Sequence, residues 1–271
     1  MLRHILPLLL VASCSGRTEP PHATEPPHSA KLPGNLAFVP ESIANRLANT
    51  NLVFAIDVSH ANLEPFLALV PAQFSCAREL VKSTGVIVIA EASPFVAYAS
   101  NLPQDGTRKC LEQLTPLLGA TTGSGADGSY EVRMADGGVS LLWQSDVVTI
   151  REVGSPPPPS GPASAEIRGL VAQVPANASA FLLSAGFPER KIKNVVLWLR
   201  AENEELQVMI RAQGTEAGVV KPWLHATVEG FKKAAIAKNI TVDDAWVKET
   251  LAEPIGTVEI RVPVSVFRQG N

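Results

Sequence analysis

The sequence is poor in the residues that point to several common functions. It has three cysteines in 271 residues, too few for a disulfide-rich scaffold or a cysteine-only zinc site. Lys and Arg (23) do not outnumber Asp and Glu (26), so no basic excess indicates a nucleic-acid partner. Aromatic residues make up 6%, which offers little surface for stacking bases or sugars. Hydrophobic residues reach 46% against 18% charged, which excludes wholesale disorder and predicts a folded body.

Short motifs of the common enzyme classes are missing as well. The sequence contains no Gly-x-Ser-x-Gly, His-Glu-x-x-His or Cys-x-x-Cys. The glycine-rich segment 119–128 lacks a Gly-Lys-Ser/Thr ending and follows a predicted helix, so it does not predict a phosphate loop. These absences favour a non-enzymatic protein without a cofactor or a resident metal.

The first residues have the pattern of an export signal. Arg3 and His4 precede an apolar run of eight residues, 5–12. A helix that crosses a bilayer core needs about 20 apolar residues, so this run is too short to span. It fits the hydrophobic region of a secretory signal peptide, which we predict over residues 1–13.

The signal ends in Val11-Ala12-Ser13-Cys14, which resembles the lipobox of bacterial lipoproteins. This resemblance implies that the Cys14 thiol receives diacylglycerol and that cleavage before Cys14 makes it the acylated N-terminus, with palmitate as a typical chain. Ser15, where an Asp would favour retention in the inner membrane, implies the outer membrane. The alternative is an ordinary cleaved signal peptide whose cysteine is incidental.

Residues 14–35 are predicted to form a proline-rich stalk. They contain the pentapeptide Thr-Glu-Pro-Pro-His twice, followed once by Ala and once by Ser. Such a run favours an extended polyproline II conformation of ~3.1 Å per residue, which gives a reach of up to about 60 Å. We interpret the segment, including His22 and His28, as a spacer between lipid and body.

The body shows alternating strand and helix patterns typical of an α+β fold. Apolar β-rich runs predict strands, and apolar residues at helical spacing predict the helices between them. The predicted arrangement is two related split-βαβ-like halves, residues 36–153 and 165–271, with mainly antiparallel sheets and helices on one face. Residues 154–164 are predicted to be a proline-rich linker or loop.

Three local signals refine this prediction. Thr107 is a candidate N-cap, and Gly119 a candidate C-cap, of a helix between them. Residues 241–244 resemble a capping box and predict a last short helix that ends before Pro254.

The whole layout resembles uncharacterised outer-membrane lipoproteins of myxobacteria and related Gram-negative bacteria. The resemblance rests on the lipobox, the low-complexity stalk, the Val39-Pro40 pair, and cysteines associated with two successive helices. It implies no activity.

After lipidation of Cys14, only Cys76 and Cys110 remain as thiols. Export places them in an oxidising compartment, and two helices on one face of a sheet can bring them into contact. We therefore predict a structural disulfide, with two buried free thiols as the alternative. A catalytic role is not predicted because no neighbouring residue supplies a base.

The segment from Asp57 to Glu64 is the one polar cluster at a strand-to-helix junction. Its Asp57, His60 and Glu64 are weak candidates for a metal or active site. Members of a catalytic triad usually come from separate segments, and Ser and Asn in the same stretch suit a helix start. We interpret the cluster as turn and cap.

The sequence thus predicts an outer-membrane lipoprotein that faces the periplasm or the cell surface, with a non-enzymatic structural or interaction role. Its expected partners are the membrane, through the anchor, and an envelope protein or small ligand; no nucleic acid is expected. One alternative is a ligand-binding lipoprotein with a pocket between the halves. The other is an envelope hydrolase or metalloenzyme around Asp57, His60 and Glu64.

Overall fold

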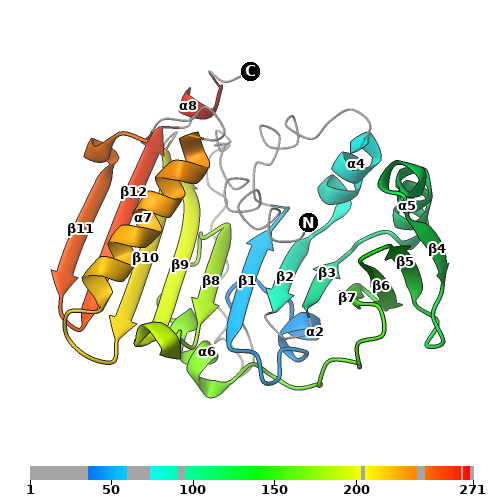
Figure 1. Cartoon of the computed structure of the whole chain (residues 1–271), viewed down its shortest axis with the longest axis horizontal. Coiled ribbons are helices and arrows are strands. Elements are labelled where there is room, and N and C mark those ends of the chain that lie inside the picture. The colour runs from blue at the N-terminus through cyan, green and yellow to red at the C-terminus, as the bar shows by residue number, and fades with distance from the viewer. Residues whose placement is uncertain are drawn as a thin grey trace, which may run out of the picture.

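The two halves of the body share a single sheet. The computed structural model describes residues 36–59, 74–90, 95–202, 205–236, 242–263 and 265–268. Within these residues, twelve strands lie in the order β11-β12-β10-β9-β8-β1-β2-β3-β7-β6-β5-β4 (Figure 1). All neighbouring strands in this order run antiparallel, which confirms the α+β class with antiparallel pairing.

The elements of the first half alternate between short helices and strands. In chain order they are α2 (Glu41–Ala44), β1 (Leu52–Asp57), α4 (Ser75–Ser83), β2 (Val86–Ala90), β3 (Val96–Ser100), α5 (Gln104–Leu118), β4 (Thr121–Ser124), β5 (Tyr130–Met134), β6 (Gly137–Gln144) and β7 (Val147–Glu152).

The second half has longer strands and the longest helix among the described residues. In chain order its elements are α6 (Ala165–Val171), β8 (Ala180–Ser184), η3 (Pro188–Arg190), β9 (Ile192–Glu202), β10 (Glu205–Gly214), α7 (Val220–Ile236), η4 (Asp244–Trp246), β11 (Val247–Ala252), β12 (Ile255–Pro263) and α8 (Ser265–Arg268).

The halves repeat one order of elements. In each, three strands (β1–β3 and β8–β10) pair in sequence, and a helix (α5 and α7) follows the third. After this helix the chain forms the edge strand of the sheet, β4 in the first half and β11 in the second. It then returns toward the centre, so that β7 pairs with β3 and β12 pairs with β10. The two halves meet where β1 pairs with β8, with Ala55 opposite Phe181. The predicted relation between the halves therefore appears in their topology.

The strand order within each half differs from the predicted split-βαβ arrangement. That arrangement needs another strand between β1 and β2, whereas these strands are direct antiparallel neighbours with Ala55 opposite Val88. The connection that contains α4 therefore joins adjacent strands. The sequence pattern specified strands and helices but not which strand edges meet.

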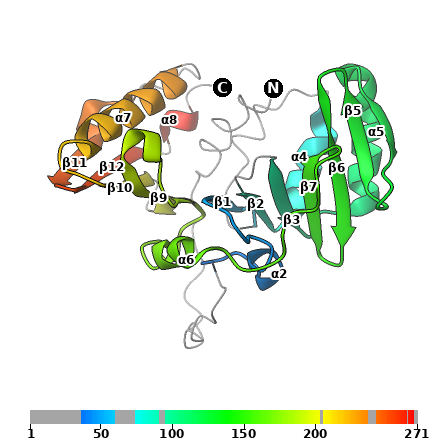
Figure 2. The ribbon, with the colours of Figure 1, turned by 60° about the horizontal axis from the view of Figure 1, so that its bottom comes forward.

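Helices lie on both faces of the sheet, so the prediction of one helical face is wrong for α2 and α6. Figure 2 shows α4, α5 and α7 on one side and α2 and α6 on the other. Alternate residues of β1 point to opposite faces, and positions 53–57 are all buried. A central strand that is apolar on both faces needs cover on both.

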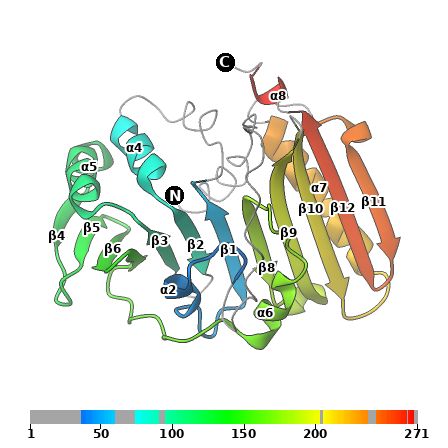
Figure 3. The ribbon, with the colours of Figure 1, turned by 180° about the vertical axis from the view of Figure 1, so that it is seen from behind.

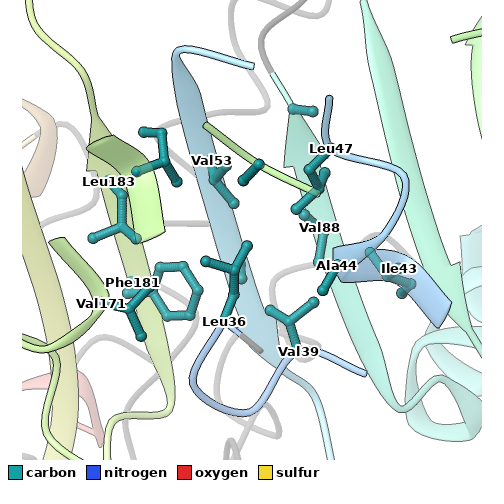
Figure 4. Packing of buried hydrophobic residues seen from close by; sticks show 14 of the residues in the cluster. Leu36, Val39, Ile43, Ala44, Leu47, Val53, Val88, Val171, Phe181 and Leu183 are labelled. Carbon is teal, nitrogen blue, oxygen red and sulfur yellow. The ribbon is translucent and has the colours of Figure 1, made fainter. Parts of the chain in front are cut away.

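The core on the α2 and α6 side is shown in Figure 4. Phe181, which has no exposed surface, lies beside Leu36, Val171 and Leu183, and Ile43 packs in the same cluster nearer α2. Dense packing of this kind stabilises the centre of the sheet, where the two halves join.

A buried tyrosine closes the same core near α2. The hydroxyl of Tyr98 on β3 donates a hydrogen bond to the carbonyl oxygen of Arg46 at 2.7 Å. Burial raises the pKa of Tyr98 to about 12, so its hydroxyl stays neutral and serves as a donor across the physiological range.

Helix α5 confirms one predicted cap and corrects the other. Gly119 ends the helix in the left-handed region at φ 59°, where glycine avoids steric cost. The helix begins at Gln104, so Thr107 is not its N-cap. Thr107 lies buried in the first turn, and its hydroxyl donates to the carbonyl of Pro103 at 2.7 Å.

The predicted last helix before Pro254 is a strand. Asp243 caps only the short turn η4, where its side chain accepts a hydrogen bond from the Ala245 amide at 2.9 Å. Residues 247–252 then form β11, which pairs along β12. Pairing with an open sheet edge outweighs the local helix signal of this segment.

Candidate functional site

The residues predicted to carry function are only partly described by the structure. Cys14, His60 and Glu64 lie outside the described residues, so lipidation at Cys14 stays a prediction. Cys76, Cys110 and Asp57 lie within them.

Asp57 serves a turn at the end of β1. Its side chain is nearly buried and accepts hydrogen bonds from the Ser59 amide at 3.1 Å and the Ser59 hydroxyl at 2.6 Å. This is the local turn geometry expected when an Asp or Ser ends a strand. In the part of the chain that the structure describes, no three His, Cys, Asp or Glu residues form a group that could hold a metal.

Cys76 and Cys110 form the predicted disulfide. The sulfur atoms are 2.05 Å apart and the Cα atoms 5.4 Å apart. The bond connects α4 to α5, and Cys110 is almost fully buried. Helix α4 itself has no fully buried residue, so the disulfide supplies a firm attachment that its packing does not.

Helix α5 is fixed to the sheet by an arginine between two aromatic rings. The guanidinium of Arg108 lies 5.5 Å from the ring centre of Tyr130 and 5.7 Å from that of Trp143. The indole of Trp143 also donates to the carbonyl of Leu102 at 3.1 Å, just before the helix. Cation–π contacts of this kind stabilise the helix position and, through it, the position of the disulfide.

A row of charged and polar groups lies on the face of β5, β6 and β7 opposite α5. Glu131, Ser140 and Arg151 lie side by side on β5, β6 and β7. Glu131 accepts two hydrogen bonds from Arg133, at 2.9 and 2.6 Å. Arg151 donates to Asp127 and, at 2.7 Å, to the carbonyl of Ser155. The row holds the loop between β4 and β5 against the sheet.

Asp127 makes this loop contact sensitive to pH. Hydrogen bonds from Ser129, and secondarily the charge of Arg151, lower the pKa of Asp127 below its ordinary value of 3.8. Because the folded-state pKa is the lower one, the carboxylate stabilises the fold above the ordinary value and loses this contribution as pH falls through the lowered value. We expect Asp127→Asn to reduce the free energy of unfolding at about pH 7.

The measurement is urea unfolding of both proteins between about pH 7 and about pH 3. The stability difference between them should shrink as the solution becomes acidic. A difference that stays constant across this range would contradict an ionic role for Asp127.

Among the described residues of the second half, no helix covers the sheet face opposite α7 beyond β8. We call it the open sheet face; it is formed by β9, β10, β12 and β11 on the side opposite α7 (Figure 3). Strand pairing places on it Asn194, Val196, Trp198, Arg200, Glu202, Glu205, Gln207, Met209, Arg211, Lys248, Thr250, Thr257, Glu259 and Arg261.

Hydrogen bonds across the strands fix the side chains of the open sheet face. Arg200 donates to Gln207, Gln207 donates to Glu259, and Arg261 donates to the same Glu259 oxygen, each at 2.6 Å. The Arg200 guanidinium also lies 5.4 Å from the ring centre of Trp198. The face is therefore polar and preorganised.

Sequence reasoning missed the open sheet face as a unit. The alternation of Glu259 and Arg261 with valine and isoleucine did predict one solvated strand face. Its neighbours on β9 and β10 could be found only from the pairing register, which brings Trp198 opposite Met209.

No helix of the described residues is long and apolar enough to cross a membrane. No protein-family model and no curated protein matches the chain.

Solved structures with a similar fold are crystal forms of a protein named TP0453. Crystal form III has a TM-score of 0.54 at 12% sequence identity and covers 83% of this chain and 96% of that chain. Crystal form I has a TM-score of 0.50 at 11% identity and covers 89% of this chain and 98% of that chain. At this identity the likeness concerns the fold alone.

Proposed function

We propose that this chain is a cell-envelope lipoprotein, anchored in the outer membrane through Cys14, whose body has a structural or interaction role rather than a catalytic one. The observation that carries the proposal is the sequence Val11-Ala12-Ser13-Cys14, placed directly after a short apolar run. The proline-rich segment that follows suits a spacer between lipid and body.

The disulfide supports the export part of this proposal. Disulfides persist in oxidising compartments such as the periplasm and are rare in the cytosol. Cys76–Cys110 joins two helices of the folded body.

The number of acyl chains explains why an anchor at Cys14 would hold the protein stably in the membrane. Each buried methylene contributes ~0.8 kcal/mol, and stable attachment needs more than one acyl chain. A diacylglyceryl group together with an N-acyl group supplies three chains. The anchored body then needs no membrane-spanning segment of its own.

We expect Cys14→Ser to abolish acylation and processing at this position. The test is to express wild-type and variant protein in a Gram-negative host with metabolic labelling by palmitate, followed by immunoprecipitation from outer-membrane fractions. The wild-type protein should carry label and the variant none. Ser15→Ala is the matched control and should stay labelled. Equal labelling of wild type and Cys14→Ser would contradict the proposal.

A further inference from the structure

Charge is unevenly distributed over the two halves. Residues 36–153 contain seven Lys and Arg and twelve Asp and Glu, whereas residues 154–271 contain thirteen and twelve. On the open sheet face the basic side chains outnumber the acidic ones. The basic residues are Arg200, Arg211, Lys248 and Arg261, and the acidic positions are Glu202, Glu205 and Glu259. A chain of net charge −3 thus has a locally positive face.

An apolar pair lies among these charges. Trp198 and Met209 are directly opposite on β9 and β10, and both are half-buried. An indole ring bordered by arginines has the amphipathic character that suits the headgroup level of a bilayer. The face therefore offers both electrostatic attraction and a shallow apolar contact.

The chain enters the described body on this same side of the sheet. Leu36 and Val39 pack with α2 and α6 on the face opposite α7, and the open sheet face continues that face over β9–β12. The described body thus begins, at Leu36, on the side of the sheet that carries the positive charge.

Because the anchor already holds the body near the membrane, a weak attraction between the open sheet face and the membrane is sufficient to orient the body. Linking a body to a surface turns contact with that surface into an intramolecular event with a high effective concentration. Each basic side chain near an anionic leaflet contributes about a fivefold gain in binding. The excess of one positive charge on the face then biases the orientation of an anchored body.

We propose that the open sheet face rests against an anionic phospholipid surface, with Arg211, Arg261 and Lys248 toward the headgroups. This rests on the anchor at Cys14 proposed above. The body would then lie flat on the membrane that holds it, with α7 directed away.

Neighbouring residues on β11 provide a matched pair of probes. Thr250 and Glu249 are both exposed, but they point to opposite faces, because Thr250 pairs with Thr257 and Glu249 with Val258. Nitroxide labels are attached to Thr250→Cys or Glu249→Cys in the mature acylated protein. Each protein is reconstituted in phosphatidylcholine vesicles with or without phosphatidylglycerol and with a trace of nickel-chelating lipid, which broadens the spectra of nearby labels.

With phosphatidylglycerol, we expect strong broadening of the label at Thr250 and much weaker broadening at Glu249. The difference should vanish in pure phosphatidylcholine and at about 0.5 M salt, where exposed charges are screened. Arg211→Ala should lower the ratio of docked to undocked protein about fivefold. Lys233→Ala, on the exposed side of α7, is the control and should leave the ratio unchanged.

Equal broadening of both labels, or broadening that does not depend on phosphatidylglycerol, would overturn the proposal. If the protein is acylated but no vesicle broadens the spectrum of the Thr250 label, the anchor at Cys14 stands and the membrane contact of the open sheet face is refuted. The face would then be a candidate binding surface for a protein partner. Absence of acyl mass at Cys14 would instead refute the proposed function.

Discussion

Replacement of both Cys76 and Cys110 by alanine should lower the free energy of unfolding by about 4 kcal/mol. The disulfide joins residues 34 positions apart, and a loop of that length restricts the unfolded chain strongly. Its removal also releases α4, which has no fully buried residue, from α5. The expected loss is a large fraction of the stability of a typical domain.

The measurement is urea unfolding of the wild-type and double-variant proteins under oxidising and reducing conditions. Reductant should destabilise the wild type toward the level of the variant and leave the variant itself unchanged. The double variant is the proper choice, because a single substitution leaves a thiol free to form new disulfides. A loss below about 1 kcal/mol would show that the bond does not stabilise the fold in the expected way.

Phe181→Ala should cost about 3–5 kcal/mol, because a large side chain is removed from a site without exposed surface. Phe181 lies on β8, where the halves join, and its ring centre is 5.2 Å from that of Phe38. Since β8 pairs with β1 of the first half, the cavity weakens both halves at their junction.

Calorimetry and urea unfolding measure the loss of stability. Fluorescent probes in each half show whether both halves are destabilised together. Tryptophan fluorescence can be compared in variants that retain only Trp143 or only Trp198, one in each half. Both signals should shift together. Leu117→Ala is the control: Leu117 is 58% exposed, so its loss should change stability by no more than about 0.5 kcal/mol. Separate transitions for the two probes would contradict a cooperative junction.

Local sequence patterns predicted most individual elements. The apolar run 53–58 predicts β1, the short runs 130–134, 139–143 and 147–152 predict β5 to β7, and the helical spacing of apolar residues from 220 to 235 predicts α7, all close to where these elements lie. These segments have strong periodicity or a clear stop such as Gly119. The disulfide partners also followed from export and from the two helices that hold them.

Elements that depend on distant partners could not be predicted in this way. β4, with the sequence Thr-Thr-Gly-Ser, has no apolar alternation and is a strand because β5 offers it backbone partners. β11 owes its strand conformation to β12 in the same way. Pairing of β1 with β8 joins residues more than 100 positions apart, which no local signal records.

The two features proposed to carry function differ in the same way: one depends on local sequence and the other on pairing between distant strands. The lipobox around Cys14 is a local motif, readable from four residues, and it remains a prediction that only chemistry can test. The open sheet face is assembled from four strands, and its composition emerges only when the register of Trp198, Met209 and Arg211 is known.

The central claim, an exported lipoprotein with a disulfide-bonded body, is tested most directly by one intact mass. The protein is extracted from membranes and alkylated without reduction, then measured by mass spectrometry. We expect a chain that begins at Cys14, carries the mass of its acyl chains and has no alkyl adducts. A chain without acyl mass, or one with two alkylated thiols, would contradict it.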